Sequence, residues 1–218
     1  MSIDGYLDTP TGPRLLLSNQ ADSDRVDEVR AGCDAILVGA NTIRRDDPRL
    51  LVRSRARRQA RVARGTTPSP VRVTLTGRGD LDPAAHVFAG GEAETIVYTA
   101  SSALDRTRER IGAAAQVVDA GDPVDLPRLL EDLDSRGVRR LMVEGGGLVL
   151  TGFLAGGLAD ELQLVIAPFL VGDSRAPRFV RDGSFPWDRE HPARLAEVRG
   201  IEDVVLLRYA LSDRFAPG

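Results

Sequence analysis

The sequence predicts an α/β fold with a mostly parallel central sheet, and three observations support this class. Short apolar runs alternate with helix-like segments, which is the doubly wound pattern; they span residues 34–39, 71–76, 95–99 and 116–119. Residues 140–152, RLMVEGGGLVLTG, predict a strand, a glycine turn and a helix. Two later runs, 195–198 and 204–209, flank a segment from Gly200 to Asp203 and predict a closing antiparallel hairpin.

The same patterns place the remaining elements. A helix is predicted over residues 22–32, because Val26, Val29 and Cys33 recur at helical spacing after a polar lead. The run at 34–39 follows Asp34 with three consecutive large apolar residues and ends in glycine, as in a strand that is covered on both faces. Further elements are a helix over 102–112, a helix capped by Asp125 and ended by Gly137, and a β run over 161–171 that contains Pro168.

Seven arginines occur between Arg49 and Arg64. Alanine, valine, serine and glutamine interrupt them, so we expect an exposed helix or excursion rather than a packed element. The functional alternative is an anion-binding patch, although charge runs more often form solvated faces.

Length and composition limit the function classes. With 218 residues, the chain suits a single domain over 1–218, and a net charge of −3 argues against a nucleic-acid partner. One cysteine and two histidines exclude a disulfide framework and cannot build a zinc-deaminase site, so no metal and no deaminase activity are expected. The sequence shows neither a membrane-length apolar run nor a secretory signal, which predicts a cytoplasmic protein without a membrane partner.

The glycine turn of residues 145–147 is the strongest candidate for a ligand site. Glycines allow a ligand to approach the backbone closely, and the helix that follows offers unpaired N–H groups to a phosphate, so a nucleotide is the natural ligand. Glu144 ends the preceding strand, at the edge where open α/β sheets place ligands. The alternative is a tight turn without a ligand, in which Glu144 is a structural anchor.

Residues 39–50 and Arg30 carry further hydrogen-bonding groups. We expect residues 39–50 to form a loop, in which Thr42 and Asp46 bind ribose or amide groups of a nucleotide; alternatively, Thr42 caps a helix and Asp46 belongs to a turn. Arg30 lies beside the apolar stripe of its helix and needs an anion, either an internal carboxylate such as Asp34 or a substrate phosphate. The two histidines have no evident catalytic neighbours, and Cys33 fits a core position.

These segments together resemble one known family, the pyrimidine reductase domain of riboflavin biosynthesis, which is the C-terminal domain of the bacterial bifunctional deaminase-reductase. The resemblance spans nearly the whole chain and includes SIDG at 2–5, RAGCDAILVG at 30–39, Thr42 with DDPRL at 46–50, Arg53, and EGGG at 144–147. It implies a dihydrofolate-reductase-like three-layer α/β/α fold with a C-terminal antiparallel hairpin, NADPH as cofactor, and a homodimer.

The resemblance also implies a reaction and a set of site residues. Hydride passes from NADPH to C1′ of the opened ribose of a 5-amino-6-(5-phosphoribosylamino)pyrimidine, so that a ribosyl side chain becomes ribityl. The substrate contacts are Arg30, Leu50, Arg53 and Glu144, and the catalytic candidates are Asp4 and Glu144. Asp4 either orders the substrate and its proton delivery or anchors a turn. The cofactor contacts are Thr42, Asp46, Gly146, Gly147, Leu148, Val149, Leu150, Thr151 and Gly152.

The chain departs from the family pattern at three places. Arg14 and Leu16 stand where many members have the serine and tryptophan of a Ser-x-Trp segment, and Gly77-Arg78 stands where a serine often meets the cofactor. Arg78 is therefore a candidate partner for the 2′-phosphate of NADPH. Members usually have a strand before the SIDG turn, so we expect a start at Met1 to leave a gap or an exposed edge in the sheet and to lower stability.

Several functions therefore remain open at this stage. The first is the reductase of riboflavin or related specialised metabolism, acting on either the uracil or the 2-amino-pyrimidinone form. The second is a reductase of another imine, carbonyl or pterin, and the third is a non-catalytic NADPH-binding relative. Oxidation of NADPH against each substrate separates them.

Overall fold

The computed structural model describes residues 1–12 and 15–215, which form two compact units. The central unit is Val26–Gly146, and the terminal unit combines Met1–Arg25 with Gly147–Gly218. Helix α1 (Gln20–Ala31) begins in the terminal unit and ends in the central unit. Each unit has its own sheet, and each is described by itself.

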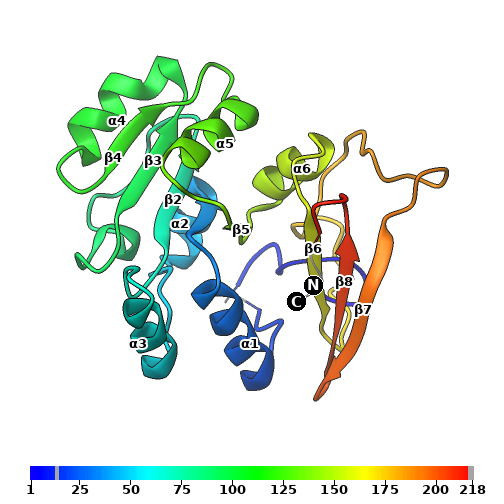
Figure 1. Ribbon diagram of the computed structural model, residues 1–218. Helices are drawn as coiled ribbons and strands as arrows, with labels where there is room; N and C mark the ends of the chain where they lie inside the picture. Colours follow the sequence, from blue (N-terminus) through cyan, green and yellow to red (C-terminus); the bar gives the residue numbers. More distant parts are fainter. Residues whose placement is uncertain (13–14, 216–218) are drawn as a thin grey trace. The chain divides into compact units, whose positions relative to one another are not determined.

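The central unit is built on a five-stranded parallel sheet with the order β4-β3-β2-β1-β5 (Figure 1). Its strands are β1 (Ala35–Gly39), β2 (Val71–Thr76), β3 (Thr95–Thr99), β4 (Gln116–Asp119) and β5 (Leu141–Val143). Leu37 of β1 is paired with Val73 of β2 and with Val143 of β5. The carboxyl ends of β1 and β5 therefore lie next to each other, which is where a parallel sheet places a ligand.

Helices connect these strands: α2 (Ala40–Asp46), α3 (Arg55–Ala63), α4 (Leu104–Ile111) and α5 (Leu126–Ser135), with short 3₁₀ turns at His86–Phe88 and Ser101–Ala103. The predicted cap of α5 is confirmed, because the Asp125 carboxylate accepts the Arg128 N–H at 3.1 Å. Ile36, Val38 and Val97 of the sheet pack with Leu50 and Ile111 in the main core.

The terminal unit contains a three-stranded antiparallel sheet, drawn as neighbouring arrows in Figure 1, with the order β6-β8-β7. Its elements are α6 (Gly147–Ala155), β6 (Glu161–Ile166), β7 (Arg194–Ile201) and β8 (Val204–Ala210). The chain start lies beside β6: the Met1 ammonium donates to the Val165 carbonyl at 2.5 Å, and Ser2 forms a parallel bridge with Ala167.

Most of the predicted elements are confirmed, including the dihydrofolate-reductase-like class with its C-terminal hairpin. The expected loop over residues 39–50 is wrong in its first half, which forms α2. Only Ala40 and Ile43 of that helix are buried, so the apolar pattern is too short to reveal its period. The β run expected over 161–171 ends at Ile166, two residues before Pro168. The hairpin is tighter than expected, because the strands meet at Glu202-Asp203, with Glu202 at φ 54°.

Candidate functional site

The site in the central unit begins where β1 and β5 end. The Glu144 N–H donates to the Leu37 carbonyl at 2.9 Å, so the pairing of the two strands continues to the acid that precedes the glycine turn. Gly145 and Gly146 then adopt φ values of 129° and 84°, which L side chains rarely adopt. A β-carbon at Gly146 would stand 3.2 Å from Thr42 Oγ1. The structure thus brings together Thr42 and Gly146, which are two of the predicted cofactor contacts.

Thr42 lies within α2 and does not cap it. Gly39 is the N-cap, and it makes no side-chain capping bond. Among the described residues the Thr42 hydroxyl has no hydrogen-bond partner, so it remains available to a ligand. Asp46 is the last residue of the helix, and Asp47 follows it as a left-handed C-cap with φ 41°. The alternative of Thr42 as a helix cap is therefore wrong.

Arg30 and Glu144 form a forked ion pair. Arg30 Nε and Nη2 each donate to one carboxylate oxygen of Glu144, both at 2.5 Å. The two side chains are only 16% and 13% exposed, respectively. Burial opposes the charge of Arg30, but the hydrogen bonds and charge of Glu144 outweigh it and raise the pKa of Arg30 above its ordinary value. This pair fixes the direction of the Glu144 carboxylate.

Of the two partners expected for Arg30, the structure shows an internal carboxylate, but this is Glu144 and not Asp34. Asp34 lies at the opposite end of β1, where its carboxylate accepts the backbone N–H groups of Arg139 and Arg140 at 2.9 and 2.8 Å. The third guanidinium nitrogen of Arg30, Nη1, donates to the Leu51 carbonyl at 3.4 Å. Arg30 therefore holds two elements of the site together.

Leu50 and Arg53 belong to the segment that Arg30 touches, but their side chains differ. Leu50 is 2% exposed and has φ 50°, so its side chain fills the core while its backbone follows a left-handed path. Arg53 is exposed, and its guanidinium makes no hydrogen bond or ion pair with the described residues. Of the predicted substrate-binding cations, Arg53 is thus the one whose donors remain available.

Asp27 positions this segment, and sequence reasoning missed it. Its carboxylate is 3% exposed and accepts the N–H of Arg53 at 2.5 Å and that of Ser54 at 3.1 Å. Arg57 Nη1 donates to the same carboxylate at 3.1 Å. The sequence pattern that could have identified Asp27 is its position three residues before Arg30 on the same helix, which places both side chains on one face.

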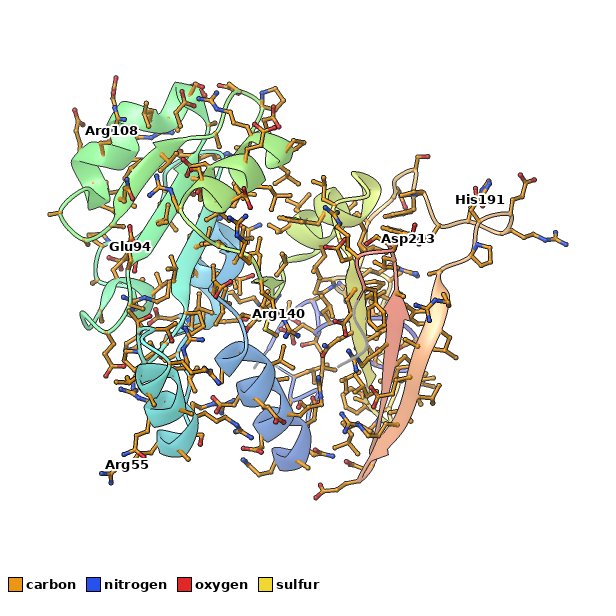
Figure 2. All side chains as sticks on the ribbon, viewed as in Figure 1. Arg55, Glu94, Arg108, Arg140, His191 and Asp213 are labelled. Atoms are coloured by element: carbon orange, nitrogen blue, oxygen red, sulfur yellow. The ribbon has the colours of Figure 1, made fainter. Side chains whose placement is uncertain are left out.

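Most of the arginine run forms helix α3, which matches the expected helix rather than an irregular excursion. Arg57 pairs with Asp27, Arg58 pairs with Glu92, and the buried Arg61 donates to the carbonyls of Ala31, Cys33 and Thr67. By contrast, Arg55 is exposed and extends away from its helix (Figure 2). Most of the run is thus taken up by internal partners, which leaves little of it for an anion patch.

The predicted cofactor residues from Gly147 to Gly152 lie in the terminal unit, in the first turns of α6. A β-carbon at Gly147 would stand 2.9 Å from the Arg178 carbonyl oxygen, so packing against this backbone requires a glycine here. Thr151 donates to the Gly147 carbonyl at 2.6 Å and accepts the Arg181 N–H at 2.8 Å. Leu148 is 55% exposed, whereas Val149 is buried.

Asp4, also in the terminal unit, anchors a turn. The Ser2 hydroxyl donates to it at 2.6 Å, and the N–H groups of Gly172 and Val171 donate at 2.7 and 3.1 Å. These bonds lower the pKa of Asp4 from 3.8 to about 2. A carboxyl group with this pKa is ionised at neutral pH and has no proton to deliver, so the geometry favours the anchoring role.

The structure describes two of the residues at which the chain departs from the family pattern, Leu16 and Arg78. Leu16 is 85% exposed, and Arg14 lies outside the described residues. Arg78 is exposed, and its backbone N–H and that of Gly79 donate to Thr76 Oγ1 at 3.3 and 3.0 Å. The guanidinium of Arg78 has no internal partner in the described part of the chain, so it can bind an anion.

The structure also describes the chain's cysteine and its two histidines. Cys33 is 2% exposed, and burial raises the pKa of its thiol to about 11, as expected of a core residue. His86 lies 2.6 Å from Asp47, and His191 lies on the loop before β7 (Figure 2). Within residues 1–12 and 15–215 there is no cluster of three or more potential metal ligands, and no helix in those ranges is long and apolar enough to span a membrane.

Comparisons with known proteins agree with this geometry. The model of the RibD C-terminal domain matches residues 1–207. The chain is 40% identical to the 2,5-diamino-6-ribosylamino-4(3H)-pyrimidinone 5′-phosphate reductase of Methanothermobacter thermautotrophicus, over 84% of this chain and 81% of the relative. It is 35% identical to the Archaeoglobus fulgidus protein of the same name, over 84% of each.

A solved structure supports the fold. The pyrimidine reductase-like protein of Corynebacterium diphtheriae superposes with a TM-score of 0.80 at 23% identity, over 96% of this chain and 88% of that one. Both the sequence and the fold thus lead to one assignment. The chain belongs to the RibD C-terminal domain family, and its relatives described above are named as pyrimidine reductases.

Proposed function

We propose that this protein is an NADPH-dependent oxidoreductase that reduces a 5-amino-6-(5-phosphoribosylamino)pyrimidine in riboflavin biosynthesis. The observation that carries the proposal is the grouping of all four predicted substrate contacts in the central unit. Arg30 binds Glu144, and Arg30 also contacts the segment that runs from Leu50 to Arg53. The names of relatives at 35 and 40% identity supply the substrate class, and they favour the 2,5-diamino-pyrimidinone form over the uracil form.

The ion pair determines what Glu144 can do. Each oxygen of a carboxylate can accept a second hydrogen bond, so Glu144 can accept N–H groups of an aminopyrimidine while Arg30 holds it in place. The guanidinium of Arg30 is already engaged, which leaves phosphate binding to Arg53. We therefore assign pyrimidine recognition to Glu144, the orientation of Glu144 to Arg30, and the 5′-phosphate to Arg53.

The residues at the ends of β1 and β5 fit a dinucleotide cofactor. Side-chain-free backbone at Gly145 and Gly146 and the unpartnered Thr42 hydroxyl leave room and a hydrogen-bonding group for a phosphate or ribose. Asp46 and the segment from Gly147 to Gly152 stay predicted cofactor contacts. When bound, NADPH supplies the hydride for C1′ of the substrate. Arg78 is the candidate that would favour NADPH over NADH, since a guanidinium suits the 2′-phosphate.

A homodimer forms part of the proposal. The sheet of the terminal unit has β7 at one edge, and Leu195 and Val198 on this strand are 50 and 59% exposed. Apolar side chains on an exposed edge strand are typical of a surface that pairs with another chain. The cytoplasmic location expected from the sequence stays a prediction.

The test is oxidation of NADPH by the purified protein, measured with each of the two pyrimidine phosphates and with dihydrofolate. We expect turnover with a pyrimidine phosphate and faster turnover with the 2,5-diamino form. Turnover with dihydrofolate alone would assign the protein to pterin reduction. Cofactor binding without turnover of any of the three would make it a non-catalytic relative.

A further inference from the structure

The segment that carries Arg53 is fastened at its backbone by one buried carboxylate. Asp27 accepts the N–H groups of Arg53 and Ser54, directly before α3 begins at Arg55. It is 3% exposed, so solvent cannot substitute for either bond. An ionised acceptor makes such bonds stronger than a neutral one would.

Asp27 is itself held in its charged form. Burial alone would raise its pKa, but the two N–H groups, together with the hydrogen bond and charge of Arg57, lower the pKa below the ordinary value. The carboxylate is thus a fixed point with three donors converging on it.

The position of Asp27 on α1 connects it to the rest of the site. Arg30 follows one turn later on the same helix, where it holds Glu144 and donates to the Leu51 carbonyl. One turn of α1 therefore fixes both the acid that faces the pyrimidine and the backbone from which the Arg53 guanidinium extends.

We infer that Asp27 is a positioning residue for substrate binding, which acts through Arg53 to set the reach of its guanidinium toward the substrate phosphate. The inference rests on the proposed function. A merely structural Asp27, needed only to anchor the backbone before α3, would alter stability and leave the recognition of phosphate unchanged. The two roles therefore differ in a measurable quantity, the ratio of kcat/KM between phosphorylated and dephosphorylated substrate.

The experiment compares Asp27→Asn with the parent, with Asp34→Asn as the matched control. Asp34 also accepts two consecutive backbone N–H groups in this unit, but at the opposite end of β1. We expect Asp27→Asn to raise KM for the phosphorylated substrate about tenfold with little change in kcat, and to reduce the preference for the phosphate by a similar factor. Asp34→Asn should leave that preference as in the parent.

An unchanged phosphate preference in folded Asp27→Asn would overturn the inference. If that variant does not fold, Arg57→Met decides, since it removes the side-chain donor to Asp27 and keeps the Asp27 carboxylate. A rise of about threefold in KM for the phosphorylated substrate supports the inference, and parent values overturn it. If the parent reduces neither pyrimidine phosphate, the proposed function is wrong and the inference falls with it.

Discussion

Arg30 holds Glu144 through two parallel hydrogen bonds of 2.5 Å, although the two residues lie 114 positions apart in the chain. Arg30 comes from α1, and Glu144 follows the edge strand β5, so the pair joins a helix to the end of the sheet. Forked arginine–carboxylate pairs fix orientation as well as charge. The pair thus positions an acid where the family's substrate is expected.

Removal of one partner should destabilise the protein. Glu144→Gln leaves the Arg30 guanidinium mostly buried without a counter-charge, and we expect a loss of about 2–3 kcal/mol in the free energy of unfolding. Urea denaturation measures this loss. The surface pair of Arg44 and Asp80, with side chains 39 and 48% exposed, is the control. Asp80→Asn should change the free energy by less than about 1 kcal/mol, and equal losses in the two variants would contradict the account of the Arg30–Glu144 pair.

Substitutions of Arg53 and Arg30 should affect substrate binding differently. The Arg53 guanidinium has no partner among the described residues, so Arg53→Ala should raise KM for the phosphorylated pyrimidine about tenfold to a hundredfold and leave KM for the dephosphorylated one nearly unchanged. Arg30→Ala should raise KM for both, since it releases Glu144. NADPH binding should be nearly intact in each variant. Steady-state kinetics with both substrates would contradict these assignments if Arg30→Ala alone lost the preference for phosphate.

Thr42 should contribute to cofactor affinity through its hydroxyl. Thr42→Val keeps the shape of the side chain, and we expect NADPH to bind about fivefold more weakly in a fluorescence titration. Thr74→Val is the control with the same chemistry, because the Thr74 hydroxyl is buried and has no hydrogen-bond partner in the described chain. That variant should bind NADPH as the parent does and should melt at the same or a higher temperature. Equal affinity in Thr42→Val and the parent would remove Thr42 from the site.

A substitution at Gly146 should change both cofactor affinity and stability. The glycine turn predicts that Gly146→Val weakens cofactor binding, but this variant does not test that contact alone. At φ 84° any side chain adds backbone strain of about 1–2 kcal/mol, so the variant would lose stability whatever it does to the cofactor.

Asp4 should act on stability rather than on protonation of the substrate. Its folded pKa of about 2 lies below the ordinary 3.8, so its stabilising effect is present above about pH 4 and is lost as the pH falls toward 2. Asp4→Asn should therefore be less stable than the parent at pH 7, and the difference should shrink as the solution is acidified. Thermal melts across that range measure it. A catalytic role would instead appear as a lost limb in the pH profile of kcat.

Much of the fold follows from local patterns. The strands over Val71–Thr76 and Thr95–Thr99 match their predicted bounds, because Pro70 and Gly77 delimit the first and the second is apolar between polar flanks. Helix α2 escaped prediction because seven residues with only Ala40 and Ile43 buried carry no visible period.

The sequence named candidate residues for the site but not the contacts between them. An arginine beside an apolar stripe needs an anion, but nothing in the local sequence distinguishes Glu144, 114 positions away, from a nearer carboxylate such as Asp34. Asp27 escaped notice for the same reason, because its partners Arg53 and Ser54 come into contact only once the segment after α2 folds back onto α1.

The most direct test of the proposed reductase is hydride transfer itself. The protein is incubated with the phosphorylated 2,5-diamino-pyrimidinone substrate and NADPH carrying deuterium at C4 of the nicotinamide, in both C4 stereoisomers. The account predicts that one isomer yields a ribityl product with one deuterium at C1′, seen by mass spectrometry and NMR. Unchanged substrate, or a product with deuterium elsewhere and none at C1′ from either isomer, would contradict it.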